Sequence, residues 1–144
     1  TEFSIDGDST WTGALDINRG TATITNCAWN GTGTNKLIAR TAGKLVIKDS
    51  DCIGANGAIE ALDAGCSLDV YRGVVKATAG DAILTNTTST RLLSLAFNAG
   101  GFAVNASAPT AITMDLCVED KALGANITDT IGNYTPNAAW AGLE

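Results

Sequence analysis

The charged residues with the clearest chemical potential lie in the middle of the chain. Asp49 and Asp51 stand two positions apart, and Asp69 and Arg72 follow further along. On one strand, Asp49 and Asp51 would point to the same side about 6.5–7 Å apart, near the carboxyl separation of an inverting glycosidase. No repeated position stacks three acids, however. We therefore expect a solvated strand face here, no catalytic residues, and a chain that is not an enzyme.

Metal and nucleophile chemistry has little support in the residue types. The sequence contains no histidine, which removes the commonest general base, the commonest metal ligand and every serine–histidine or cysteine–histidine nucleophile. Asp6 and Asp8 flank a glycine as at the start of a calcium loop, but the closing glutamate expected about twelve positions on is replaced by Ile17. We therefore expect a turn at Asp6 and Asp8, with no metal and no cofactor.

The four cysteines are Cys27, Cys52, Cys66 and Cys117, and no two of them form a C-x-x-C pair. A zinc site or a redox pair is therefore not expected. We predict small buried thiols, with two disulfides as the alternative for a secreted chain. No basic and then apolar leader is visible at the N-terminus, so no secretory signal is expected.

The composition excludes several classes of protein. With 144 residues, 45% of them hydrophobic, the chain can bury the core of a single domain. No apolar run approaches the roughly 18–20 residues of a membrane span. The net charge is −6, and lysine and arginine are not clustered, which argues against DNA or RNA. We predict neither a membrane nor a nucleic-acid partner.

Two ladders of short apolar segments repeat along the chain with a period of about 22 residues. The first ladder places Ile38, Ile59, Ile83, Val104 and Ile127 after glycine or asparagine turns. The second ladder alternates apolar and polar residues around Ile24, Ile47 and Val70, and its next member is Leu93 or Leu95. Both patterns predict strands of about 3–6 residues. Two strand ladders that share one period indicate a solenoid in which each repeat forms one coil.

The predicted fold is all-β: a right-handed, single-stranded parallel β-helix of about four to five coils with irregular capping ends. Residues 14–120 form the helix, residues 1–13 an N-terminal cap, and residues 121–144 a C-terminal cap or docking tail. We expect Ile38, Ile59, Ile83 and Val104 to form one interior column, and Ile24, Ile47 and Val70 another. The corners are expected to use glycine and asparagine, which tolerate a left-handed backbone.

The blocks AGKLVIKDSDC, AGCSLDVYRG and GDAILTN resemble the right-handed parallel β-helix proteins of the pectate-lyase-like kind over residues 14–120. This resemblance implies a fold and not an activity, since the same coil serves polysaccharide lyases, phage tailspikes and adhesins. The lyases use calcium-binding acids with a basic proton acceptor, which Asp49, Asp51, Asp69 and Arg72 could imitate. Five coils are few for these enzymes, so the chain is most similar to a bacteriophage virion component.

The function expected from this resemblance is that of a structural virion protein that decorates or cements a phage capsid and lies on the capsid surface. We expect a homotrimer, and the phage major capsid protein as a partner, with Trp11, Tyr134 and Trp140 making the contacts. The first alternative is a carbohydrate-binding tail-fibre or tailspike adhesin, with Tyr71 as the sugar contact. Tyr71 is expected in an outward column with Thr25 and Lys48. The second alternative is a polysaccharide lyase or hydrolase.

Overall fold

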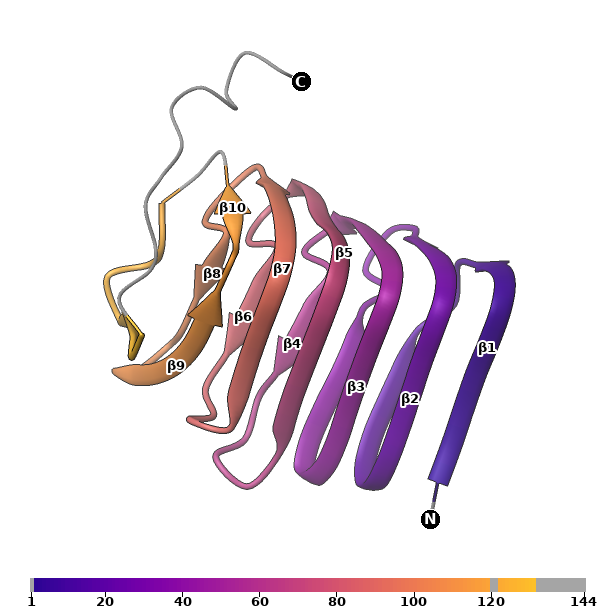
Figure 1. The fold of residues 1–144 in the computed structure, drawn as a ribbon, viewed down its shortest axis with the longest axis horizontal. Coiled ribbons are helices and arrows are strands. Elements are labelled where there is room, and N and C mark those ends of the chain that lie inside the picture. The colour runs from indigo at the N-terminus through magenta and orange to yellow at the C-terminus, as the bar shows by residue number, and fades with distance from the viewer. Residues whose placement is uncertain (1, 120–121, 132–144) are drawn as a thin grey trace.

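The computed structural model describes residues 2–119 and 122–131, and it shows a parallel β-solenoid of about 5 turns (Figure 1). Every strand pair in the described residues is parallel, as the repeat predicted. The strands are β1 (Glu2–Trp11), β2 (Leu15–Gly31), β3 (Leu37–Asn56), β4 (Ile59–Ala61), β5 (Ser67–Ala79), β6 (Ile83–Thr85), β7 (Thr90–Ala99), β8 (Val104–Asn105), β9 (Thr110–Asp115), β10 (Val118–Glu119) and β11 (Ile127–Asp129). No helix long and apolar enough to cross a membrane occurs in the described part of the chain.

Each coil contributes to three faces of the solenoid, which we name by their residues. Face I stacks residues 44–48, 67–71 and 90–93. Face II stacks residues 51–54, 74–77 and 96–99. Face III stacks residues 37–39, 59–61, 83–85 and 104–105. Because the long strands β2, β3, β5 and β7 continue from face I into face II, one bend in each of them sets the direction of face II.

That bend is made by one residue with a left-handed backbone in every coil. The column consists of Gly7, Asn26, Asp49, Arg72, Ser94 and Leu116, with φ between 50° and 87°. Asparagine and aspartate tolerate this conformation, but arginine and leucine adopt it only where the surroundings impose it. The stacked hydrogen-bond ladders on both sides therefore fix the corner, even where the residue type does not favour it. The turn expected at Asp6 is the first of these corners.

The second predicted interior column is confirmed. Ile24, Ile47 and Val70 stack in register and are almost completely buried. The column continues with Leu92 and Met114, rather than with Leu93 or Leu95. Leu92 follows Val70 by 22 positions instead of the 23 that separate the earlier members, so Leu93 falls on the outer side of face I.

The first predicted column is correct at Ile59, Ile83 and Val104, but wrong at Ile38. Leu37 pairs with Ile59 and is fully buried, whereas Ile38 pairs with Glu60 and is only half-buried on the outer side of face III. Since successive side chains in a strand point to opposite sides, an error of one position reverses the orientation. Leu37 and Ile38 are both apolar, so alternation alone did not distinguish them.

The cysteines are unbridged thiols, as predicted. Cys27, Cys52 and Cys66 are buried and Cys117 is half-buried. Burial, helped by the negative charge of Asp51, raises the pKa of Cys52 to about 12. A thiol of this kind packs as a small apolar side chain and stays protonated near neutral pH.

The close approach of stacked coils gives a stability prediction at Gly73. A Cβ atom there would lie 2.0 Å from the carbonyl oxygen of Ser50 in the neighbouring coil. Gly73→Ala should therefore lower the free energy of unfolding by about 1–3 kcal/mol, the usual cost of overpacking. Gly13→Ala is the matched control, because a Cβ atom at Gly13 meets nothing within 4 Å. Urea denaturation of both variants measures the difference, and equal stability would contradict this packing.

Candidate functional site

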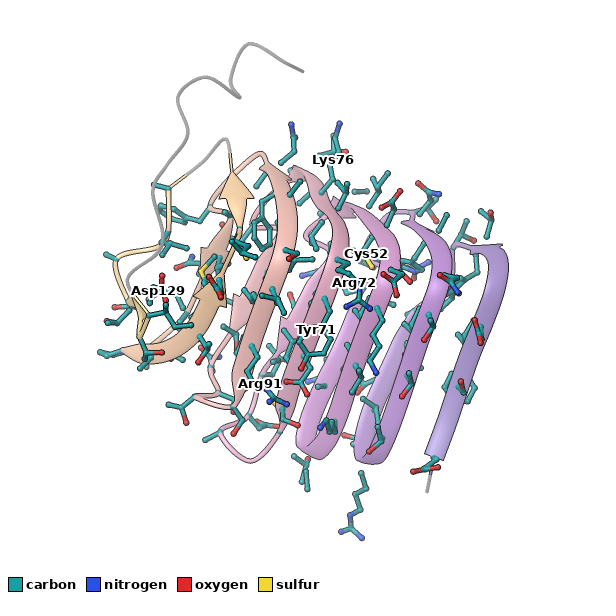
Figure 2. All side chains as sticks on the ribbon, in the orientation of Figure 1. Cys52, Tyr71, Arg72, Lys76, Arg91 and Asp129 are labelled. Atoms are coloured by element: carbon teal, nitrogen blue, oxygen red, sulfur yellow. The ribbon has the colours of Figure 1, made fainter. Side chains whose placement is uncertain are left out.

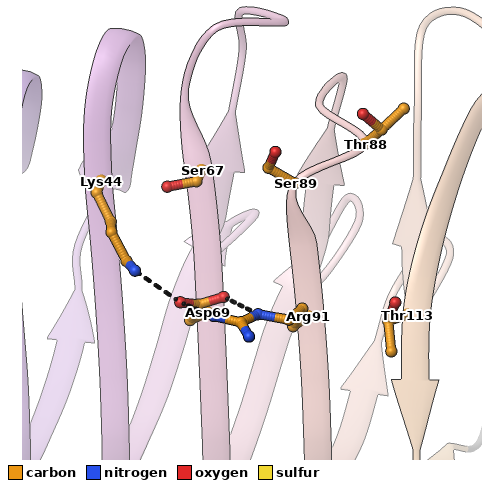
Figure 3. Close-up of a pocket in the computed structure, with 7 residues that line it drawn as sticks. All are labelled: Lys44, Ser67, Asp69, Thr88, Ser89, Arg91 and Thr113. Atoms are coloured by element: carbon orange, nitrogen blue, oxygen red, sulfur yellow. Dashed lines mark hydrogen bonds and ion pairs between the residues drawn. The ribbon is translucent and has the colours of Figure 1, made fainter.

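The strongest cluster of charged groups lies on the outer side of face I and is centred on the carboxylate of Asp69 (Figure 3). Arg91 donates two hydrogen bonds to it, from Nε to Oδ1 and from Nη2 to Oδ2, both of 2.8 Å. Lys44 Nζ lies 3.2 Å from Oδ2 on the opposite side. Asp69 is only 4% exposed, while the side chains of Lys44 and Arg91 are 41% and 59% exposed.

The stacking register places these side chains together. Asp69 in β5 pairs directly with Arg91 in β7, and Lys44 in β3 pairs with Ser67, two positions before Asp69. Residues two positions apart on a strand share a side, so Lys44, Asp69 and Arg91 project from three neighbouring coils onto one surface. Arg91 follows Asp69 by one repeat of 22 positions, and Lys44 stands one repeat of 23 positions before Ser67, so no loop is needed to assemble them.

The electrostatic environment keeps the Asp69 carboxyl ionised. Burial raises its pKa, but the hydrogen bonds from Arg91 and Lys44 outweigh burial, and the net result is a pKa below the ordinary value. The hydrogen bonds to Asp69 and the charge of that carboxylate raise the pKa of Arg91, with a further electrostatic contribution from Tyr71. A buried carboxylate in this state is stable only while both cations stay in place.

A pocket of about 310 Å³ opens beside this cluster. It is lined by charged and hydroxyl side chains from successive coils: Lys44, Ser67, Asp69, Thr88, Ser89, Arg91 and Thr113. Two cations face one carboxylate, so the pocket carries a net positive charge in a chain whose net charge is −6. Its walls supply many hydrogen-bond donors alongside a comparable amount of apolar surface.

Tyr71 extends this surface toward the corner between faces I and II. It stacks in register with Lys48 and Thr25, which confirms the predicted outward column. Tyr71 is half-buried and stands two positions after Asp69 on the same side of β5. Figure 2 shows Tyr71, Arg72 and Arg91 projecting from the same broad side of the solenoid. An aromatic ring and a cationic pocket are thus neighbours.

The four charged residues suspected from the sequence do not form one site. Asp49 occupies the left-handed corner, where its carboxylate accepts two hydrogen bonds from Arg72, of 2.6 and 2.9 Å. Asp51 belongs to face II and accepts a weak hydrogen bond from the Val74 amide. Asp49 and Asp51 therefore do not share one side of a straight strand, because Asp49 itself forms the corner and Asp51 follows it on face II. The Arg72 hydrogen bonds hold the pKa of Asp49 below its usual range.

Lys44 and Arg91 were not identified from the sequence. The repeat contained the necessary signal, because Arg91 follows Asp69 by 22 positions. Once the column members are aligned in register, that spacing predicts an ion pair between neighbouring coils. The sequence analysis placed Leu93 or Leu95, rather than Leu92, after Val70 in the inner column, so Asp69 and Arg91 were not aligned with each other.

The prediction that the chain is not an enzyme is wrong in its premise. It rested on the absence of histidine and of three stacked acids, yet the fold gathers one acid, Asp69, with Lys44, Arg91 and serine and threonine hydroxyls around one pocket. A carboxyl group with a shifted pKa, in a pocket with specific charge partners, is a feature of functional sites in general. We therefore withdraw the exclusion of catalysis.

Of the three residues predicted to contact partners, Trp11 is the one within the described residues, and it does not line this pocket. Trp11 packs against Trp29 in the next coil, with ring centroids 6.4 Å apart and an edge-to-face angle of 62°. Tyr134 and Trp140 lie outside the described residues. Within residues 2–119 and 122–131, no group of three cysteine, aspartate or glutamate side chains is placed to hold a metal ion.

Substitution of Asp69 tests the cluster through its pH dependence. Because the folded-state pKa of Asp69 is lowered, its ionised form stabilises the fold above about pH 4, the usual range of an unfolded carboxyl. This contribution is lost as the pH falls through the folded-state pKa. Asp69→Asn should therefore cost about 1–3 kcal/mol at pH 7, typical of charge-assisted hydrogen bonds. The difference from the unsubstituted chain should shrink toward pH 2.

The measurement is the free energy of unfolding at several pH values, by denaturant titration. Asp49→Asn is the control, because its ion pair with Arg72 is exposed and surface pairs contribute little. The Asp69 variant should lose clearly more stability at pH 7 than the Asp49 variant. Equal losses would mean that burial of Asp69 has no energetic role.

Comparison with known proteins gives no relative: no protein-family model, no curated protein and no solved structure matches the chain. The parallel solenoid is therefore established from the coordinates of the chain itself. What the chain does must likewise be inferred from its own side chains and their geometry.

Proposed function

We propose that face I binds a saccharide that carries carboxylate groups. The observation that carries this proposal is the pocket in which Lys44 and Arg91 flank a single buried carboxylate. The two cations exceed the charge of Asp69, so an incoming carboxylate would meet a site of opposite sign. Among the alternatives from the sequence, this corresponds to the carbohydrate-binding adhesin.

The unused hydrogen-bonding capacity supports the same ligand class. The guanidinium of Arg91 has five N–H donors. Its Nε and Nη2 groups donate hydrogen bonds to Asp69, so Nη1 can donate to a ligand. Lys44 has one contact with Asp69 and three donors in all. Ser67 and Ser89 add hydroxyls that can donate or accept. A sugar acid offers a carboxylate for the cations and hydroxyls for the serines.

The buried Asp69 positions the two cations for this task. Two hydrogen bonds fix the plane of the Arg91 guanidinium relative to the carboxylate, and such paired bonds give geometric specificity. Less side-chain freedom is then lost when a ligand binds. The ring of Tyr71 lies beside this array and offers a rigid aromatic surface against which the apolar side of a sugar ring can pack.

Other roles predicted from the sequence stay predictions. They are the pectate-lyase-like relationship, a virion origin, capsid decoration or cementing, and a homotrimer with the capsid protein as partner. A lyase or hydrolase acting on the same kind of saccharide is compatible with the proposed ligand. The binding experiment below should therefore include a search for shortened or unsaturated products.

Binding is tested by calorimetry with galacturonate oligomers and with neutral galactose oligomers of equal length. We expect the acidic oligomers to bind more tightly, and their affinity to fall as salt is added. Arg91→Gln should weaken that binding by about tenfold or more, since charge-assisted hydrogen bonds contribute about 1.5–3 kcal/mol. Tyr71→Ala should weaken it as well.

Arg40→Gln is the matched control. Arg40 also forms an exposed ion pair, with Asp16, but it does not line this pocket. Its substitution should leave the affinity unchanged. Equal binding of acidic and neutral oligomers, or equal effects of the two arginine substitutions, would overturn the proposal, and so would the failure of both oligomers to bind.

A further inference from the structure

Lys48 is a cation on the outer side of face I that does not line the saccharide pocket. It shares its side of β3 with Lys44, because the two residues stand four positions apart. Within residues 2–119 and 122–131, Lys48 forms no ion pair. Its charge acts on Asp49, but both oxygens of that carboxylate already accept hydrogen bonds from Arg72. The Lys48 ammonium is therefore available to a second group of a bound ligand.

Tyr71 connects Lys48 with the pocket. It pairs in register with Lys48 in the neighbouring coil, and it follows Asp69 by two positions on the same side of β5. Figure 2 shows Tyr71 between Arg91 and the corner residue Arg72. A ligand that leaves the pocket along β5 therefore passes over the Tyr71 ring and arrives beside Lys48.

The separation of the cations indicates how long such a ligand must be. Four positions on one strand place the Cα atoms of Lys44 and Lys48 about 13 Å apart. One sugar ring does not span that distance. A single sugar acid therefore occupies the pocket alone, and a second acidic group reaches Lys48 only from a ring further along the same oligosaccharide.

The outward columns of face I favour this direction over one along the solenoid axis. Next to the pocket, the column that contains Asp69 and Arg91 continues along the axis to Thr23 on one side and to Thr113 on the other. An oligosaccharide laid along the axis would place its further acidic groups beside these threonines. Laid along β5, it brings the second acidic group to the cation of Lys48.

The column of Tyr71 leads to the same conclusion. Its members, in coil order, are Asp6, Thr25, Lys48, Tyr71, Leu93 and Asp115. Lys48 is the one cation in this column, and it lies in the coil next to Tyr71. An acidic group that has passed over the Tyr71 ring therefore meets a charge of opposite sign only at Lys48.

We propose that the saccharide on face I lies along β5, across the solenoid axis, and that Lys48 binds its second acidic group. The first acidic group binds between Lys44 and Arg91, and an intervening ring packs on Tyr71. The ligand class is thus an oligosaccharide with acidic groups on rings that are not neighbours. This inference rests on the proposed binding of a carboxylate-bearing saccharide and adds a second contact and a direction to it.

The test uses three ligands in calorimetry: galacturonate, its trimer, and a mixed trimer with one galacturonate followed by two galactose units. They are titrated into the unsubstituted chain, Lys48→Gln and Lys76→Gln. Lys76 is the matched control, because it is also a lysine without an ion pair in the described part of the chain, but it lies on face II. Backbone amide signals are followed by NMR in the same titrations.

We expect the galacturonate trimer to bind at least threefold more tightly than the monomer or the mixed trimer. Lys48→Gln should weaken trimer binding about three- to fivefold, the size expected for an exposed ion pair, and should leave the other two ligands unaffected. Lys76→Gln should change none of the three affinities. The trimer should shift the amide signal of Lys48, and the monomer should not.

An equal effect of Lys48→Gln on trimer and monomer would overturn the inference, and so would a trimer that binds no more tightly than the monomer. A trimer that shifts the amide signal of Thr23 instead of Lys48 would show that the chain runs along the axis. None of these results removes the proposed function if Arg91→Gln still weakens binding of the monomer. Failure of every acidic ligand to bind the unsubstituted chain would refute both.

Discussion

The register between neighbouring coils is the constraint on which the rest of this structure depends. Each residue in the stacked segments is held opposite its counterpart about 22 positions away by parallel backbone hydrogen bonds. These bonds decide which side chains point inward, and they impose a left-handed backbone at Arg72 and Leu116, where the residue type does not favour it. A change at one position is therefore transmitted to the coil on either side. This explains why a single Cβ atom at Gly73 would meet the carbonyl of Ser50.

The same register creates the charged site. Asp69 is buried among the coils, and a buried carboxylate is tolerated only with compensating partners. Arg91 and Lys44 provide them because they project from the adjacent coils on the same side. Asp49 and Arg72 also form an ion pair between neighbouring coils, but this pair is exposed at the corner. Burial, and not the presence of an ion pair, separates the two clusters and makes Asp69 the anchor of a pocket.

A repeating stack of coils has no intrinsic end. Every interior coil covers its neighbours, so the terminal coils need some other cover. At the C-terminal end, the described residues provide it. In the first coil, Ile5 and Trp11 are half-buried against the core.

The sequence alone determined the parallel solenoid, the approximate number of coils, the column of Ile24, Ile47 and Val70, and the outward column of Thr25, Lys48 and Tyr71. These followed from the period of the repeat and from strict alternation within strands. Only the tertiary structure decided that Leu37 points inward in place of Ile38, and that Leu92 continues the inner column. Adjacent apolar residues satisfy either register, and only the ladder of a neighbouring coil selects one. The structure also separated Asp49 from Asp51 and joined Asp69 to Arg91 and Lys44. Sequence distance does not report whether a corner lies between two residues, or which residues of different coils become neighbours, because both depend on how the coils stack.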